Sequence, residues 1–557
     1  MSETYKIFNP KILSYACMAL GVLFCLIVSY FGMRYNVDSI YDEAFLFFNQ
    51  KSAINGNIAG MSQGTSIIAS IFGDTVCSTI LGLRTCGWWL KIICVLIFTL
   101  LTCDLFGKGW KHYGGYFFVC MLMLAPSLYD IVLCHNGLAQ FFLCIAMAFG
   151  YRILMKESNW NNFWCVCVGI CCTYGMFSIL PSALLLMVSM FILLLLKYWK
   201  SWKILILYIG STFLGLIIGI TTVHNFVVDI PSILVAMNEA AQNVTTLNRG
   251  YDPMSFLIKF LLFIRDWVLC IMTILGGLYI SNKVCKTRYN WFASVILLGV
   301  LIVYSLYQQK PQITFSMLLS VMWLLLLFNK IKDNEIKCRI DFNTLLNIFL
   351  IMAPIILSIG TNTYLGGKMR YFMLPWAILL YRLGWNQKVV PYRLTVSIFV
   401  TILLCLPIVN TVKTINSNGY LVNQGPLEKM YLTNQQNQHF ELCDSIMSKY
   451  DFKAQESVIY TTQLGMMTVC YLDGINCANY FQPMDFVAYA ENDNLSRPDF
   501  MFLCDYDIDV SGQELEQIGW GWPEEFDVYD VGTPETAQVG YPTTRKLYCR
   551  KSLRNND

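Results

Sequence analysis

The chain is built from long apolar runs that short polar connections separate. About thirteen of these runs approach the ~20 residues that an α-helix needs to cross the hydrocarbon core of a bilayer. They lie at 12–32, 87–106, 114–133, 136–151, 160–178, 181–196, 204–223, 257–280, 291–307, 312–328, 343–360, 371–385 and 394–411. The pattern predicts a polytopic α-helical membrane protein whose multi-helix domain occupies residues 1–411.

Charged residues alternate between successive connections. Every second connection, counted from the N-terminus, is rich in Lys and Arg, whereas those between them carry Asp and Glu. Because basic connections stay in the cytoplasm, the alternation predicts a cytoplasmic N-terminus in a plasma or inner membrane. An odd number of spans then places the C-terminal segment outside the cytoplasm.

The segment 412–557 has a different character. It carries 10 Lys/Arg against 21 Asp/Glu. Helical spacing at 427–450 and β-rich runs at 457–462 and 499–504 predict an extracytoplasmic acidic α/β domain. Its negative charge would repel phosphates, which argues against a nucleic-acid partner.

Composition supports a membrane location. A soluble globular protein carries about 25% charged residues, but only 13% of this chain is charged and 56% is hydrophobic. Most of the 22 cysteines lie inside apolar runs, where Cys behaves as a small hydrophobic residue. In the C-terminal segment, Cys470 and Cys477 flank a turn-like stretch, and their disulfide state is left open.

Two long loops on the predicted external side, 33–86 and 224–255, contain amphipathic stretches. Long loops in a compact protein usually serve function. The first loop holds the acidic cluster Asp38, Asp42 and Glu43 in "VDSIYDEAFLFF". A carboxylate there could be a general base that takes the proton of an acceptor hydroxyl. Alternatively, these acids simply favour the N-terminal end of a helix.

A second candidate site is "GGKMRYFMLPW" at 366–376, where Lys368 and Arg370 are cations on the predicted external side. The positive-inside rule disfavours them there, and they suit a phosphate-bearing ligand. The alternative is snorkelling to lipid headgroups. Within the span at 257–280, Arg265 and Asp266 are adjacent. Adjacent helical side chains do not face each other, so we expect their partners on other elements.

"YDEAFLFF" together with the Arg370, Tyr371 and Pro375 pattern resembles the C-type glycosyltransferase superfamily (GT-C). The similarity is strongest to its branch of protein mannosyltransferases and aminoarabinose transferases. "APSLYDIVLCHNGLAQFF" at 125–142 resembles the helix pair that carries the family's second external polar motif, and "LPSALLLM" resembles the helix entry after it. This chain departs from that motif by offering Asp130 and His135.

The resemblance implies roles for individual residues. Asp42 would be the catalytic base, and Glu43 would orient the acceptor or support Asp42. Arg370, Lys368 and Tyr371 would bind the donor phosphate. Further acceptor or donor contacts would come from Asp38, Asp130, His135, Asn136, His224, Arg249, Lys310 and Tyr364.

The resemblance also implies an activity in cell-envelope glycan biosynthesis. The enzyme would transfer a hexosyl or pentosyl group from a polyprenyl-phosphate sugar, with inversion, to a glycan, lipid or protein acceptor. No cofactor is expected, although some relatives use a divalent metal. A lipid-linked polysaccharide polymerase, a transporter of envelope glycan and a non-catalytic sensor are the alternatives.

Overall fold

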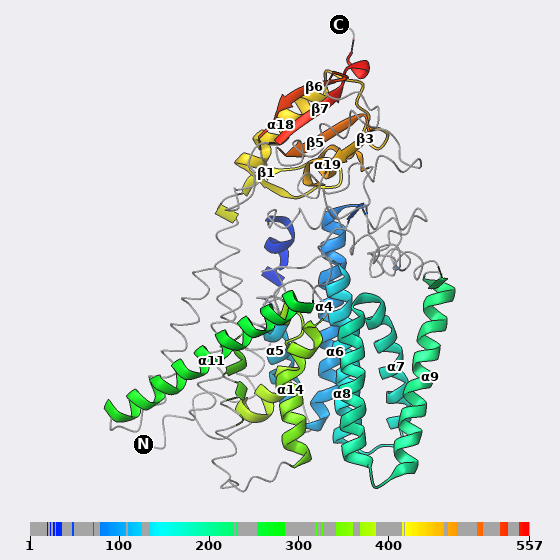
Figure 1. Ribbon diagram of the computed structural model, residues 1–557, viewed down its shortest axis with the longest axis vertical. Coiled ribbons are helices and arrows are strands. Elements are labelled where there is room, and N and C mark those ends of the chain that lie inside the picture. Colours follow the sequence, from blue (N-terminus) through cyan, green and yellow to red (C-terminus); the bar gives the residue numbers. More distant parts are fainter. Residues whose placement is uncertain are drawn as a thin grey trace.

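The computed structural model places the helices in one body and a β-sheet with its helices above it (Figure 1). It describes residues 78–106, 110–124, 133–227, 253–284, 341–359, 368–385, 418–461, 466–476, 498–504, 524–532 and 545–555, with isolated positions in 19–35, 47–48, 71, 230–231, 316–326 and 415–416. The predicted spans 291–307 and 394–411 lie outside these residues.

The helical part is a bundle of long apolar helices. Its elements are α4 (Ile80–Thr102), α5 (Trp110–Leu124), α6 (His135–Met155), α7 (Asn161–Ser178), α8 (Leu180–Tyr198), α9 (Trp202–Phe226), α11 (Pro253–Val284), α14 (Phe342–Ser358) and α16 (Leu374–Leu379), which continues as the π-helix Leu380–Trp385. Among the described residues, four helical segments are long and apolar enough to cross a membrane: Ile80–Leu105, His135–Met155, Leu180–Tyr198 and Trp202–Asn225.

One helix begins well ahead of its predicted start. α4 begins at Ile80, ahead of the predicted start at 87, because the Thr79 side chain accepts a hydrogen bond from the Gly82 amide at 3.0 Å and caps the helix. α5 is described to Leu124, and residues 125–132 of its predicted span lie outside the described residues.

Apolar side chains on the outer helices face away from the protein. On α8, Val188, Phe191 and Ile192 are about half exposed, and on α9 Ile206 and Phe213 are exposed by 63% and 61%. In water such a surface would cost about 25 cal/mol for each Å². Lipid removes this cost, so the chain is an integral membrane protein.

Helices α7 and α9 pack with their backbones close together. A Cβ atom on Gly169 would lie 2.2 Å from the Thr212 carbonyl oxygen, and one on Gly215 would lie 2.1 Å from the Val166 carbonyl oxygen. Small residues permit this approach, which is a common way of joining helices in a bilayer. α7 also packs on α6, and α6 packs on α4.

The C-terminal part contains two sheets. Strands β1 (Asn418–Leu421) and β2 (Tyr431–Thr433) form an antiparallel pair. The second sheet has the order β4-β3-β5-β7-β6, from β3 (Val458–Thr461), β4 (Ile475–Asn476), β5 (Phe500–Cys504), β6 (Phe526–Asp530) and β7 (Arg545–Arg550). β3 runs parallel to β4 and β5, and β7 runs antiparallel to β5 and β6.

Two helices belong to this part, α18 (Asn434–Met447) and α19 (Met466–Leu472). A capping box between Thr433 and Gln436 starts α18. On the inner face of α18, the buried His439 ring lies within hydrogen-bonding distance of the Val531 carbonyl oxygen (2.9 Å) and of Thr468 Oγ1 (3.0 Å). His439 therefore links α18 to α19 and to the chain just after β6.

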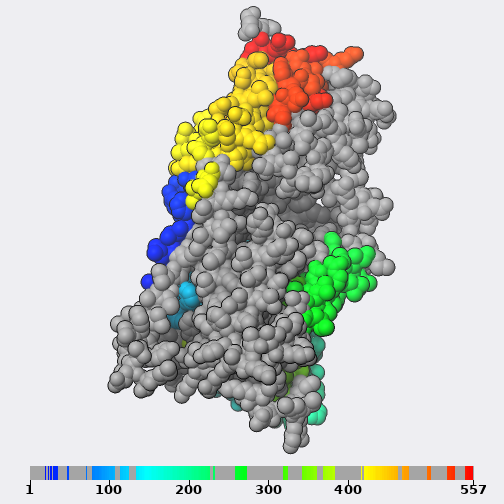
Figure 2. Space-filling view, turned by 90° about the vertical axis from the view of Figure 1, so that its left-hand side faces the viewer, coloured from blue at the N-terminus to red at the C-terminus, as the bar shows by residue number. Residues whose placement is uncertain are grey.

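The C-terminal part packs on the N-terminal ends of α4 and α6. The Ile80 amide donates a hydrogen bond to the Pro426 carbonyl oxygen at 2.9 Å. One apolar cluster combines Leu83 and Leu138 with Leu427 and Met430. In the space-filling view, described residues near the N-terminus adjoin the start of the C-terminal part (Figure 2).

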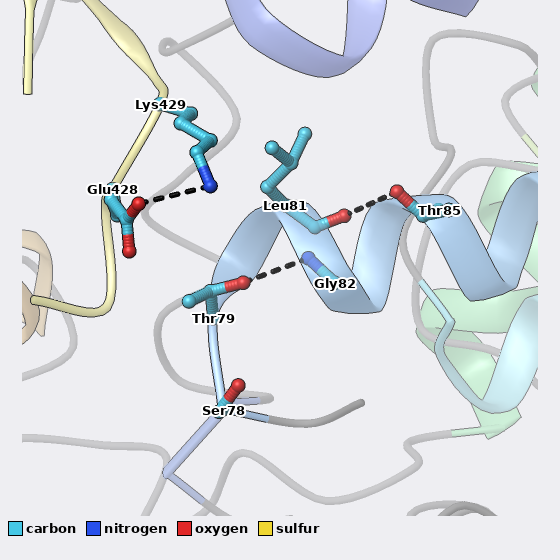
Figure 3. A pocket seen from close by; sticks show the side chains of 7 residues that line it. All are labelled: Ser78, Thr79, Leu81, Gly82, Thr85, Glu428 and Lys429. Atoms are coloured by element: carbon cyan, nitrogen blue, oxygen red, sulfur yellow. Dashed lines mark hydrogen bonds and ion pairs between the residues drawn. The ribbon is translucent and has the colours of Figure 1, made fainter. Parts of the chain in front are cut away.

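A recess of about 310 Å³ remains at this junction. Glu428 and Lys429 pair with each other at 3.0 Å and face the first turn of α4 (Figure 3). The Thr79 hydroxyl at the start of α4 and the Thr85 hydroxyl in its next turn take part in hydrogen bonds within the helix. The recess therefore lies between the two parts of the chain, and its two charged side chains and both threonine hydroxyls already have local partners.

Candidate functional site

Three cations gather around the ring of Tyr371. The ring centroid lies 5.3 Å from the Arg370 guanidinium carbon, 5.7 Å from Lys368 Nζ and 5.6 Å from Lys91 Nζ. Aromatic rings attract cations at such distances. We call Lys91, Lys368, Arg370 and Tyr371 the cation cluster.

Local backbone structure fixes one side of this cluster. The Tyr371 amide donates to the Lys368 carbonyl oxygen at 3.1 Å, and the Phe372 amide donates to the Met369 carbonyl oxygen at 3.0 Å. This turn leads directly into α16, with Pro375 in the first turn of the helix. Tyr371 is 3% exposed, so its ring is held in place by the residues packed around it.

Lys91 enters from α4, and the sequence analysis missed it. It is 2% exposed and lies inside the apolar run 87–106. An ionisable residue within a membrane helix is costly and usually functional. This rule could have identified Lys91 as a functional candidate from the sequence. No pattern along the chain, however, shows that Lys91 meets residues 368–371.

The second polar motif contributes the first turn of α6. Lys368 is close enough to the His135 imidazole for its positive charge to act on that ring, and His135 is the first residue of α6. The N-cap residue Cys134 makes no side-chain cap hydrogen bond. The N-terminal end of a helix carries a partial positive charge, so α6 adds to the positive field of the cation cluster.

Asn136 follows His135 at this end of α6. Asn136 is 6% exposed, and its Oδ1 accepts no hydrogen bond from any residue that the structure describes. A buried amide oxygen of this kind can accept a hydrogen bond from a hydroxyl group of a ligand. His135, Lys368, Arg370 and Tyr371, which two separate motifs predicted, are thus brought into one region.

The other predicted site residues are not found at the cation cluster. His224 lies near the end of α9, where its Nδ1 accepts a hydrogen bond from the Ile230 amide at 3.4 Å. α9 packs mainly on α7 and lies at the edge of the helical body, apart from α4, the helix that carries Lys91 (Figure 1). The remaining candidates lie outside the described residues: Asp38, Asp42, Glu43, Asp130, Arg249, Lys310 and Tyr364.

The cation cluster is suited to an anion. Arg offers a planar fork that matches phosphate oxygens, and Lys offers a compact charge. The adjoining helix N-terminus favours negative charge as well. Within the part of the chain that the structure describes, no group of three His, Cys, Asp or Glu residues could hold a metal ion.

No protein-family model matches the chain. No curated protein sequence matches it either. The chain is similar over 97% of its length to the structure of ArnT from Cupriavidus metallidurans bound to undecaprenyl phosphate, covering 99% of that chain at 11% identity and a TM-score of 0.42.

A second similarity is to the oligosaccharyltransferase of Archaeoglobus fulgidus in complex with Zn and sulfate. It covers 91% of this chain and 71% of the other, at 12% identity and a TM-score of 0.46. The chain is therefore similar to solved structures of ArnT and of an oligosaccharyltransferase.

Proposed function

We propose that the protein is a membrane glycosyltransferase that transfers a sugar from a polyprenyl-phosphate donor to an extracytoplasmic glycan, lipid or protein. The observation that carries this proposal is the cation cluster beside the first turn of α6. A lipid-linked phosphate can reach such a site from the bilayer. Nucleotide sugars are not normally present outside the cytoplasm, which favours a lipid-linked donor.

The cation cluster would act on the leaving group. As the bond between the anomeric carbon and the phosphate oxygen breaks, negative charge grows on the phosphate. Preorganised cations stabilise that charge most in the transition state. Arg370 would hold two phosphate oxygens, while Lys368 and Lys91 would each add a charge-assisted contact.

Asp42 would activate the acceptor. Its carboxylate takes the proton of the acceptor hydroxyl, the hydroxyl oxygen attacks the anomeric carbon, and the polyprenyl phosphate leaves with the bonding electrons. Attack from the face opposite the leaving group inverts the anomeric configuration. Glu43 would orient the acceptor. The sugar would contact Asn136 and other residues of the second motif.

The proposed topology opens this site toward the external side. α4 and α6 begin beside the C-terminal α/β part, and Lys91 follows Ile80 by eleven positions, or about 16 Å along a helix. A phosphate at that depth would lie inside the helical body, because the hydrocarbon core is about 30 Å thick. The polyprenyl chain would then extend between helices into the bilayer.

A panel of labelled polyprenyl-phosphate sugars tests the proposal. Protein reconstituted in bilayers should release label from one of these lipids, and the released lipid should be polyprenyl phosphate. Asp42→Asn should reduce the rate by about 10²–10⁴-fold, the usual contribution of a general base, while the donor still binds. Arg370→Ala should weaken donor binding and slow transfer, and Arg370→Lys should be intermediate.

Two results would contradict the proposal. One is that no lipid-linked sugar in the panel binds or reacts. The other is that the Asn and Ala variants, at matched expression, turn over as fast as the unmodified protein.

A further inference from the structure

A second recess, of about 400 Å³, lies between the first helix and α4. The structure describes the first helix continuously from Ser29 to Tyr35. The described lining residues lie between positions 26 and 33 of that helix, together with Trp88 of α4. Apart from Ser29, these residues are apolar or aromatic. The recess is therefore a hydrophobic pocket between two helices, and we call it the helix recess.

A buried arginine joins the two helices beside the helix recess. Arg84 is 1% exposed, and its Nη1 donates hydrogen bonds to the carbonyl oxygens of Met33 at 2.6 Å and Gly32 at 3.2 Å. Carbonyl groups in the last turn of a helix need partners from outside the helix. Arg84 precedes Trp88 by four positions, so the two residues share one face of α4. The helix recess is thus bounded by two helices that are fixed against each other.

The side chains around the helix recess face lipid. On the first helix, Leu26 and Ile27 are 48% and 47% exposed, and on α4 Trp89 and Ile93 are 53% and 42% exposed. Unfilled apolar volume destabilises a protein in proportion to its size. A hydrocarbon chain from the bilayer is the filling that such a surface favours.

Two buried polar groups indicate which kind of lipid fits. Ser29 is 1% exposed and Trp88 is 8% exposed. Neither the Ser29 hydroxyl nor the Trp88 indole N–H has a hydrogen-bond partner among the residues that the structure describes. A buried donor without a partner is costly, and a buried indole N–H usually finds one. Hydrocarbon accepts no hydrogen bond, so the ligand needs an acceptor near these two residues.

The depth of both residues in the membrane agrees with an ester carbonyl as that acceptor. Trp88 lies one position after the start of the predicted span 87–106, and Ser29 lies three positions before the end of the span 12–32. Where a span ends, the hydrocarbon core gives way to the headgroup region, and tryptophan is enriched there. The ester groups of glycerophospholipids lie at the same level. A polyprenyl chain carries no acceptor along its length.

We propose that the helix recess binds one acyl chain of a membrane glycerophospholipid, whose ester carbonyl oxygen accepts a hydrogen bond from Trp88 Nε1. The Ser29 hydroxyl is the second donor to the same ester group. The bound chain fills the gap between the first helix and α4 and stabilises their contact. This site involves neither the sugar donor nor the acceptor, so it is independent of the proposed function.

The test compares two lipids on the purified full-length protein in detergent. One is a phosphatidylethanolamine with ester-linked chains, and the other is its ether-linked analogue with the same headgroup and chain length. The ether lipid keeps the hydrocarbon but lacks the carbonyl groups. Native mass spectrometry should show that the ester lipid binds about 2–10-fold more tightly, the contribution of a typical hydrogen bond. The ester lipid should also raise the unfolding temperature more.

Three variants assign the preference to the helix recess. Trp88→Phe keeps an aromatic ring but removes the N–H, so it should bind the two lipids equally. Trp89→Phe is the matched control, because Trp89 is the neighbouring indole and is 53% exposed. It should keep the full preference for the ester lipid. Ser29→Ala should reduce that preference, and it carries the comparison if Trp88→Phe does not fold.

Three results would overturn the proposal. The first is equal binding of the ester and ether lipids by the unmodified protein, a measurement that needs no variant. The second is a full ester preference in both Trp88→Phe and Ser29→Ala. The third is displacement of the bound phospholipid by polyprenyl phosphate, which would assign the helix recess to the chain of the sugar donor. None of these measurements uses sugar transfer, so failure here leaves the proposed function untouched.

Discussion

At the residue scale, the side chains that the sequence analysis missed are buried cations. Arg84 and Lys91 lie on α4, and each meets a segment distant in the chain. A sequence pattern shows that a charge interrupts an apolar run, but it does not show which carbonyl groups or rings that charge meets. The cations at 368 and 370 were predicted because topology makes external Lys and Arg unusual.

One residue-scale prediction was wrong. Arg265 and Asp266 were expected to find partners on other elements, yet they pair with each other at 2.8 Å. The helix geometry that separates adjacent side chains holds for short residues. The long Arg side chain can bend around the helix and reach the Asp266 carboxylate.

Lys91 provides a direct test of the cation cluster. Lys91→Met keeps the length and apolar stem of the side chain but removes its charge. Since a hydrogen bond to a charged group contributes about 1.5–3 kcal/mol, donor affinity should fall by about 10–100-fold. Binding of labelled polyprenyl phosphate to the purified variant measures this.

Lys197→Met is the matched control for Lys91→Met. Lys197 lies at the last turn of α8 and donates a hydrogen bond to the Leu154 carbonyl oxygen at 2.6 Å. This variant should bind the donor like the unmodified protein. Equal donor affinity in the Lys91 and Lys197 variants would remove Lys91 from the phosphate site.

At the element scale, hydrophobic periodicity predicted several helices closely. The predicted spans 160–178 and 181–196 correspond to α7 and α8, and the predicted and observed boundaries differ by at most two residues. The β-rich runs at 457–462 and 499–504 contain β3 and β5. Helix packing could not be predicted in the same way, because glycine spacing does not identify the partner helix.

The α7–α9 contact gives an element-scale prediction. Gly215→Val should separate the two helices, because a Cβ at this position would overlap the backbone of Val166. Gly210→Val on the same helix is the control, since no atom outside the local helix backbone lies within 4 Å of a Cβ there. We expect the first variant to lower the unfolding temperature in detergent and the second to change it little.

Comparison of the two glycine variants isolates the packing effect. Valine has the same intrinsic helix preference at either position, so this preference does not contribute to the difference in unfolding temperature between the two variants. If both variants unfold at the same temperature, close backbone packing does not hold α7 to α9.

At the scale of the whole molecule, charge alternation predicts which connections face the cytoplasm. Cysteines introduced at Ser62 and at Gly512 should react with an impermeant thiol reagent added outside intact cells, while one at Lys332 should not. A background without reactive native cysteines is needed. Labelling at Lys332 with protection of the other two would reverse the proposed orientation.

At this scale, the C-terminal part contacts one of the helices that carry the cation cluster. It contacts the N-terminal end of α4 through Pro426, and Tyr431 stacks on Tyr35 of the N-terminal segment. The sequence predicted an α/β unit in this segment, but not that it packs on α4. Such contacts depend on the three-dimensional arrangement of distant segments.

The central claim is that the cation cluster holds the phosphate of a polyprenyl-linked donor. The most direct test is photo-crosslinking with a polyprenyl phosphate whose photoreactive group lies next to the phosphate. Mass spectrometry should find the label on peptides containing Lys91, His135 or Arg370. Unlabelled polyprenyl phosphate should compete, and the alcohol polyprenol should not. Label confined to other peptides, or equal competition by polyprenol, would contradict the account.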